Sequence, residues 1–282
     1  MVVNGHAAGE IIGTLCDMNL HYEAYPGELS AFDSDTVPVI ILPGLFGSTT
    51  NWRGFAKKLA HTVPVVVLDQ RNHGRSPHAD THSYQDMVDD LLAFVDHHDL
   101  SQIVLCGHSM GGKAAMLFAH QFPERLSKLA VLDIAPVEYS HSHASFVRAM
   151  LEINLTELKS RNEADRQLSS VITDTATRLF LLQSLVGSPG AYEWRLNLPV
   201  LLEYMPQIIG FPESALDASA VAVPTLFLYG ANSHYVQADH HALIRHYFSH
   251  AEFESVPNAG HWLHAEQPDL VLQALLRFLQ RD

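Results

Sequence analysis

The strongest constraint on the fold of this chain is a series of short apolar runs bounded by turn-forming residues. Continuous rather than alternating hydrophobicity is typical of strands covered on both faces, as in a parallel sheet. Amphipathic stretches over 84–100 and 111–126 lie between these runs. This alternation predicts an α/β fold with a doubly wound, mostly parallel sheet. The runs are VPVIILPG (37–44), VPVVVLDQ (63–70), QIVLCGHS (102–109), KLAVLDIAP (128–136) and VPTLFLYG (223–230).

The alternation stops between residues 136 and 222, where the pattern becomes helical and then irregular. We expect these residues to form a helical cap inserted at the carboxyl edge of the sheet, between core segments 1–135 and 223–282. In open α/β sheets, ligands bind at that edge. After the insertion, the pattern predicts a helix near 237–248, a strand over 251–257 and a last helix from Pro268.

Charge and composition exclude some classes of function and favour others. The formal net charge is −14 at pH 7 with no cluster of lysine or arginine, which excludes a typical nucleic-acid binder and favours a small uncharged substrate. No segment approaches the roughly 18 continuous apolar residues that cross a bilayer. The stretch MVVNGHAAGEIIGTL lacks a basic signal-peptide region, and Cys16 and Cys106 are the only cysteines, so we predict a reducing, cytoplasmic location. Oligomeric state stays open.

The stretch GHSMGGK (107–113) follows an apolar run and precedes a helix of small residues. This context is typical of a nucleophile elbow, in which the serine lies on a strained turn between strand and helix. Because the turn crowds its neighbours, the positions two before and two after the serine must be small, and here both are glycine. The pattern predicts Ser109 as a catalytic nucleophile, activated by a histidine base.

The base should lie late in the chain, on the loop after the last strand. VPNAGHWLHAEQP contains His261 directly after a glycine and His264 three residues later. We predict His261 as the base and keep His264 as the alternative.

The base needs a carboxylate that orients it, in the chain order serine, acid, histidine. A Gly-x-x-Asp pattern after the 223–230 strand would be the usual place, but the sequence there is Gly230, Ala231, Asn232, Ser233. Asp133 ends the preceding strand at the same sheet edge. We predict Asp133 as the acid, with Asp239 as the fallback.

Backbone N–H groups should stabilise the oxyanion that forms on the substrate. We predict the N–H of Met110, next to the nucleophile, and that of Leu45 in the loop PGLFGST, with Phe46 as a second candidate. In DQRNHGRSP (69–77), we interpret Asp69 and Arg71 as a buried structural pair rather than a substrate site.

With these residues placed, the chain resembles the α/β-hydrolase superfamily, and within it the YbfF-type serine esterases. The resemblance rests on GLFGS, DQRNHGRSP, GHSMGGKA, DIAPVEY, EWRLNLPVL and AGHWLHAE. It implies hydrolysis of carboxylic esters, with thioesters as a second option, through an acyl-enzyme and without metal or organic cofactor. Those esterases carry the acid in Asp-Ile-Ala-Pro, which agrees with Asp133. They usually have histidine where this chain has Pro43, so a hydrogen bond from that side chain is lost.

Other functions remain open at this stage. Carbon–carbon bond hydrolases and cofactor-free perhydrolases use the same triad, and basic residues of the insertion that could suit the former are Arg148 and Arg195. A non-catalytic ligand receptor on the same fold is a third class. Apolar residues of the insertion either line a pocket or pack, with packing expected for most of them: Phe146, Met150, Leu151 and Leu155. We expect surface positions and no metal for the histidines His240, His241, His246 and His250.

Overall fold

The computed structural model describes residues 18–28, 37–216 and 220–281. The N-terminal stretch and Cys16, used above to predict location, lie outside the described residues. Cys106 is a buried free cysteine within the core.

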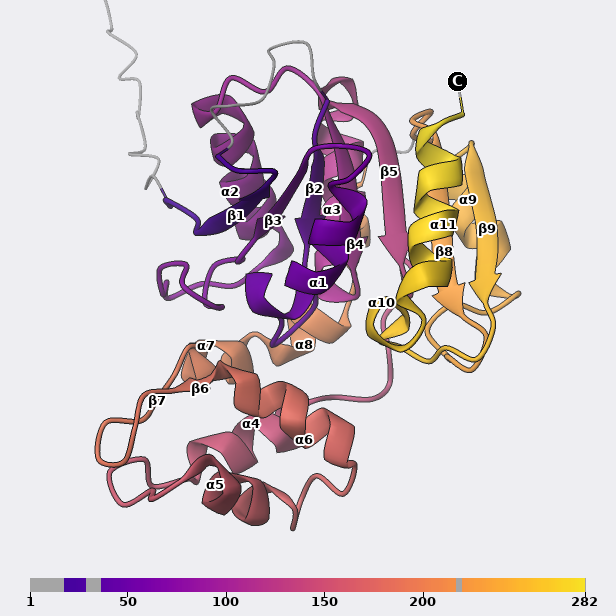
Figure 1. Ribbon diagram of the computed structural model, residues 1–282. Coiled ribbons are helices and arrows are strands. Elements are labelled where there is room, and N and C mark those ends of the chain that lie inside the picture. The colour runs from indigo at the N-terminus through magenta and orange to yellow at the C-terminus, as the bar shows by residue number, and fades with distance from the viewer. Residues whose placement is uncertain (1–17, 29–36, 217–219, 282) are drawn as a thin grey trace, which may run out of the picture.

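The core is a sheet of seven strands in the order β1-β3-β2-β4-β5-β8-β9 (Figure 1). Every pairing from β3 to β9 is parallel, whereas β1 pairs antiparallel with β3 at the edge. The predicted α/β fold with a mostly parallel sheet is therefore confirmed. The strands are β1 (Tyr22–Tyr25), β2 (Val39–Leu42), β3 (Val65–Leu68), β4 (Ile103–His108), β5 (Leu126–Leu132), β8 (Thr225–Gly230) and β9 (Ala251–Val256).

The sheet is covered on both faces, which explains the continuous apolar runs. Ile40 and Ile41 are adjacent in β2 and both fully buried, yet they belong to different hydrophobic clusters on opposite faces. One face packs against α1 (Thr49–Leu59) and α11 (Pro268–Leu279). The other face packs against α2 (Tyr84–His97), α3 (Met110–Gln121) and α9 (His240–Tyr247). Shorter helical turns are η2 (Pro123–Arg125) and α10 (Leu263–Glu266).

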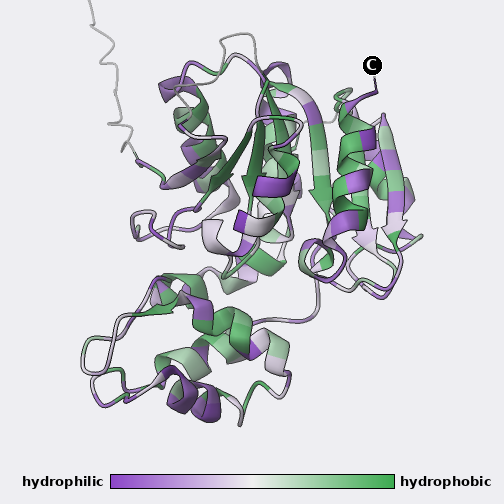
Figure 2. Cartoon of the chain, in the orientation of Figure 1, coloured by the Kyte–Doolittle hydropathy of each residue, from purple (hydrophilic) through white to green (hydrophobic). Residues whose placement is uncertain are grey.

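Between β5 and β8 the chain forms a lobe of short helices beyond the carboxyl ends of the strands, at the bottom of Figure 1. The irregular part of this insertion contains a two-stranded hairpin, β6 (Leu185–Val186) with β7 (Glu193–Trp194), that the sequence pattern did not predict. Figure 2 shows that α5 is largely hydrophilic, which places polar residues at the end of the lobe far from the core. The helices are α4 (Ala144–Leu151), α5 (Arg161–Leu168), α6 (Thr175–Leu181), η3 (Leu182–Ser184), α7 (Leu198–Glu203), α8 (Met205–Ile209) and η4 (Glu213–Ala215).

The edge strand β1 is also absent from the sequence prediction. It is four residues long and half-buried throughout, so it has no continuous apolar run to identify it. Its pairing with β3 depends on residues at least forty positions away, such as Tyr22 opposite Leu68.

Candidate active site

Ser109 lies at the sharp turn between β4 and α3, where its backbone has φ 52° and ψ −119°. This left-handed conformation is strained for a residue with a side chain. Close backbone contacts hold the turn. A Cβ at Gly107 would lie 2.3 Å from the carbonyl oxygen of Gly111, and a Cβ at Gly111 would lie 2.3 Å from that of Leu42. Only glycine fits at either position, which is the physical basis of the G-x-S-x-G pattern.

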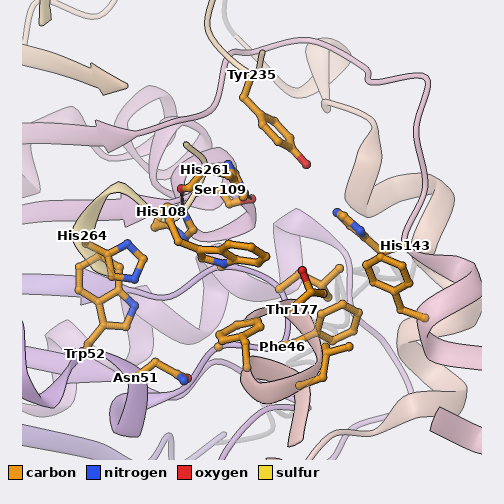
Figure 3. A pocket seen from close by; sticks show the side chains of 17 residues that line it. Phe46, Asn51, Trp52, His108, Ser109, His143, Thr177, Tyr235, His261 and His264 are labelled. Atoms are coloured by element: carbon orange, nitrogen blue, oxygen red, sulfur yellow. Dashed lines mark hydrogen bonds between the residues drawn. The ribbon is translucent and has the colours of Figure 1, made fainter. Parts of the chain in front are cut away.

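The structure brings Ser109, His261 and Asp133 into one hydrogen-bonded row (Figure 3 shows Ser109 beside His261). The Ser109 hydroxyl lies 3.0 Å from His261 Nε2, and His261 Nδ1 lies 2.7 Å from Asp133 Oδ2. Because a carboxylate only accepts hydrogen bonds, Nδ1–H donates to Asp133. The Nε2 lone pair is thereby directed at the Ser109 hydroxyl.

Neither alternative candidate is hydrogen-bonded to this row of side chains. Asp239 is exposed at the N-cap of α9, and no contact joins its side chain to His261 within the described residues. His264 lies in α10, where its ring stacks on Trp52 with 3.9 Å between centroids. No hydrogen bond within the described ranges connects His264 to Ser109 or Asp133.

Burial controls the protonation of the acid–base pair. The Asp133 side chain has no exposed surface, and this desolvation raises the pKa of Asp133 to about 6 against the opposing effect of hydrogen bonds from Ser233 and Gly230. Burial also lowers the pKa of His261 below its usual range. A lowered histidine pKa keeps the imidazole neutral at pH 7, which is the state a general base requires.

The loop that carries the predicted oxyanion donors is held by residues 70 and 73, which follow β3. Gln70 Nε2 donates to the carbonyl oxygen of Pro43 at 2.7 Å, and the N–H of Phe46 donates to His73 Nε2 at 3.1 Å. The Phe46 N–H is therefore occupied. No hydrogen bond within the described residues uses the N–H of Leu45, and Met110 is the first residue of α3, where an N–H has no acceptor inside the helix.

His73 is held in one tautomer by its two neighbours. Its Nδ1 lies 3.0 Å from the carbonyl oxygen of Arg71, so Nδ1 carries the proton and Nε2 accepts from Phe46. Burial lowers the pKa of His73 to about 4, which keeps the ring neutral. Sequence reasoning missed this role, because nothing local in DQRNHGRSP indicates which distant N–H group His73 accepts from.

The predicted pairing of Asp69 with Arg71 is wrong, although both residues are buried. Asp69 instead accepts from the backbone N–H groups of Thr49 at 2.6 Å and Arg75 at 2.8 Å. Arg71 forms a bidentate pair with Asp90 on α2, at 2.6 and 2.7 Å. The carboxylate of Asp69 is directed at the first residue of α1 and at its own loop, whereas the guanidinium of Arg71 is directed at α2.

A cavity of about 250 Å³ opens onto Ser109. None of the described residues that line it is aspartate, glutamate, lysine or arginine, and neither Arg148 nor Arg195 is among them. Of the four apolar residues of the insertion that the sequence analysis named, Phe146 lines the cavity and Met150 is buried in the core. Leu155 packs against the core, and Leu151 is exposed. The lining residues are Gly44, Leu45, Phe46, Gly47, Asn51, Trp52, His108, Ser109, His143, Phe146, Thr177, Phe180, Leu181, Tyr235, His261, Trp262 and His264 (Figure 3).

Residues 18–28, 37–216 and 220–281 contain neither a cluster of metal-ligating side chains nor a membrane-spanning helix. No group of three or more histidine, cysteine, aspartate or glutamate side chains there is placed to hold a metal ion. No helix in these ranges is long and apolar enough to cross a membrane.

A strained serine at a strand-to-helix turn, within hydrogen-bond distance of a histidine that a buried carboxylate orients, defines the class of serine hydrolases built on an α/β sheet. The chain belongs to the alpha/beta hydrolase fold family, whose model matches residues 37–268.

The similar proteins define the reaction. The sn-1-specific diacylglycerol lipase ABHD11 of Mus musculus is 42% identical over 271 residues, covering 93% of this chain and 87% of the lipase. Esterase YbfF of Escherichia coli (strain K12) is 34% identical over 243 residues, covering 86% and 92%. A solved marine microorganism esterase matches with a TM-score of 0.86 at 38% identity, covering 93% and 99%. The protein is a serine hydrolase of carboxylic esters, and the predicted resemblance to YbfF-type esterases is confirmed.

Proposed function

We propose that the protein hydrolyses uncharged carboxylic esters through an acyl-enzyme formed on Ser109, with His261 as general base and Asp133 as the acid that orients it. The observation that carries this proposal is the position of His261, within 3.0 Å of the Ser109 hydroxyl and 2.7 Å of the Asp133 carboxylate. The contacts of a resting triad have these lengths.

The chemistry follows from these contacts. Ser109 Oγ attacks the carbonyl carbon of the ester while its proton moves to His261 Nε2, and the carbonyl oxygen becomes an oxyanion. The N–H groups of Leu45 and Met110 donate to that oxyanion. When the tetrahedral intermediate collapses, the bond to the leaving alcohol breaks and His261 returns the proton to the alcohol oxygen. Water then attacks the acyl-enzyme by the same route and releases the carboxylic acid.

The composition of the cavity supports an uncharged lipid ester as substrate. Aromatic and aliphatic side chains dominate its lining, and no lysine or arginine is among the described residues that line it to bind a charged carrier or a dicarboxylate. The mouse relative is named a diacylglycerol lipase, so neutral glycerolipids such as diacylglycerol are the substrates we propose. In this proposal residues 136–222 act as a cap that supplies Phe146, Phe180 and Leu181 to the acyl chain.

The same composition argues against the alternatives. A carbon–carbon bond hydrolase acting on a dioxobutenoate-type substrate needs basic groups near the serine, and both arginines of the insertion that could supply them lie away from the cavity. A charged thioester carrier would lack a cationic partner there for the same reason. A cytoplasmic location and a non-receptor role stay predictions.

The test uses p-nitrophenyl esters of increasing acyl length on the wild type and on Ser109→Ala. We expect turnover to fall by about 10⁴-fold or more in the variant, because Ser109 carries the one hydroxyl among the described residues that hydrogen-bonds to His261 Nε2. Ser170→Ala, at an exposed position in the insertion, should match the wild type. A fluorophosphonate probe should label Ser109 in the wild type. Equal turnover in wild type and Ser109→Ala would refute the proposal.

A further inference from the structure

The imidazole of His264 lines the active-site cavity and has no hydrogen-bond partner in the described part of the chain. The residue is 7% exposed, and its Nδ1 is buried without a partner. No hydrogen bond among residues 18–28, 37–216 and 220–281 uses its Nε2 either. An unpaired polar atom in the interior costs free energy, so its presence requires an explanation such as a role in catalysis or in binding.

Packing explains an aromatic ring at position 264 but not a histidine. The ring stacks face to face on Trp52, with 3.9 Å between centroids and 7° between planes. The ring of His108 meets it edge-on, with 4.8 Å between centroids. Phenylalanine would make both contacts without burying a polar atom. The two nitrogens therefore have a function that this packing does not supply.

The proposed mechanism does not use these nitrogens. His261 already contacts Ser109 through Nε2 and Asp133 through Nδ1, so the acid–base pair is complete. The neighbouring His108 is also engaged, because its Nε2–H donates to the carbonyl oxygen of His261 at 2.8 Å. Binding therefore remains as the role of the His264 nitrogens.

His264 lies on the side of the cavity where the alcohol part of the ester must start. In the proposed mechanism His261 returns its proton to the leaving alcohol oxygen, so that oxygen lies beside His261. The ring of His108 lies between the two, with 4.8 Å from its centroid to that of His261 and 4.8 Å to that of His264. A group a few bonds beyond the ester oxygen can therefore reach His264.

Figure 3 shows His264 beside Trp52 on one side of the cavity and His143 on the opposite side. Thr177, also away from His264 in this view, belongs to α6, the helix that carries two of the cap residues proposed for the acyl chain. The alcohol and acyl parts of the substrate therefore have different surroundings, and the alcohol side contains the unpaired imidazole.

The protonation state of His264 limits what it can bind. Burial, together with the neighbouring His108 and His261, lowers the pKa of His264 well below its usual range, so the ring is neutral at pH 7. A neutral imidazole has one N–H donor and one acceptor nitrogen. A hydroxyl both donates and accepts, so it pairs with whichever nitrogen faces the cavity. The ring has no charge to attract a carboxylate or a phosphate.

We propose that His264 is a specificity-determining residue that binds a free hydroxyl on the alcohol part of the substrate, so that the protein prefers partial glycerides to esters without such a hydroxyl. The proposal deepens the function proposed above and rests on it. In a 1,2-diacylglycerol the free hydroxyl lies a few bonds from the ester oxygen at C1, whereas in a triacylglycerol that hydroxyl is esterified. A substrate without the hydroxyl leaves the ring nitrogen unpaired, which is the physical basis of the preference.

The first experiment compares three soluble esters with the wild type: 1,2-dibutyrylglycerol, its 3-O-methyl ether, and 1,2-propanediol dibutyrate, which lacks the hydroxyl and controls for the bulk of the methyl group. We expect kcat/KM for 1,2-dibutyrylglycerol to be about 3- to 10-fold higher than for the other two, as for one neutral hydrogen bond. Release of butyric acid at constant pH measures all three. Equal values would overturn the proposal, whereas no hydrolysis of these esters or of p-nitrophenyl butyrate would refute the proposed function itself.

The second experiment repeats the comparison with His264→Phe, which keeps an aromatic ring against Trp52 and removes both nitrogens. We expect the ratio of kcat/KM between 1,2-dibutyrylglycerol and 1,2-propanediol dibutyrate to fall to about one. The matched control is His250→Phe, the same change at an exposed position, which should keep the wild-type ratio. If His264 were only structural, its loss would lower kcat/KM for all esters in proportion and leave the ratio unchanged.

A second nitrogen-free variant, His264→Leu, keeps the test decisive if phenylalanine disturbs folding, which thermal unfolding measures. It should lose the preference in the same way, because the nitrogens rather than the ring carry the selection. A wild-type ratio in either folded variant would overturn the assignment of the hydroxyl site to His264.

Discussion

The two walls of the active-site cavity are built by different means. The core wall carries Ser109 and His261 on strand ends and tight turns, where backbone atoms pack so closely that a single added Cβ would lie 2.3 Å from a carbonyl oxygen. The cap wall carries Phe146, Phe180 and Leu181 on helices of seven and eight residues. Backbone packing permits one geometry, whereas side-chain packing on short helices tolerates changes of volume. In the function proposed above, the core wall carries out the chemistry and the cap wall sets the selectivity for the acyl chain.

The lobe between β5 and β8, which we propose as the cap, is joined to the core through polar side chains that bind its backbone. The buried Lys113 donates to the carbonyl oxygens of Ile209 at 2.8 Å and Gly210 at 2.5 Å, and the Tyr84 hydroxyl donates to that of Ile208 at 2.6 Å. These carbonyls belong to the last turn of α8 and the residue after it, where helices leave acceptors unsatisfied. The cap is thus positioned at one end by α2 and α3 of the core, independently of the residues that line the cavity.

The largest effect on kcat is expected from Asp133→Asn, on the core wall. An asparagine keeps the shape but stabilises the wrong tautomer of His261, so we expect kcat to fall about 10⁴-fold with the fold intact. The matched control is Asp239→Asn, at an exposed N-cap, which should change kcat less than twofold. Steady-state kinetics with a p-nitrophenyl ester and thermal unfolding measure both effects. The reverse pattern would assign the acid to Asp239.

A smaller effect is expected from His73→Ala, which acts on the core wall through the oxyanion loop. The variant removes the acceptor for the Phe46 N–H and leaves that donor buried, so we expect kcat to fall about 10- to 100-fold with little change in KM. His78→Ala, at an exposed position in the same loop, is the control. A variant that changed only KM would show that His73 shapes binding rather than the oxyanion site.

The smallest effect on chemistry is expected from Phe146→Ala on the cap wall. The change enlarges the cavity, so the optimum acyl length should move to longer esters while kcat for short esters stays within about threefold. Leu151→Ala, an exposed position on the same helix, should leave the length profile unchanged. The profile of kcat/KM against acyl length measures the shift. A collapse of kcat for every ester would contradict the proposed division between the walls.

The sequence predicted the core wall well, because its signals are local. Continuous apolar runs identified the central strands, and the two glycines around Ser109 marked a turn whose steric demands involve contiguous residues. The strand end at Asp133 and the loop histidine His261 were found from their places relative to those strands. Weak local signals were missed, as with the four half-buried residues of β1.

What the sequence by itself determined is therefore the element order, the parallel sheet and the set of residues that meet at its carboxyl edge. Apart from the contact between Asp133 and His261, the tertiary structure alone decided which polar groups pair. Arg71 binds Asp90 rather than its near neighbour Asp69, and Ser233 bonds to a carboxylate 100 positions away. The physical reason is that backbone periodicity and steric exclusion act between neighbours in the chain. A hydrogen bond between distant residues instead requires the donor–acceptor distance to be right to within a few tenths of an ångström, and only the packed fold establishes that distance.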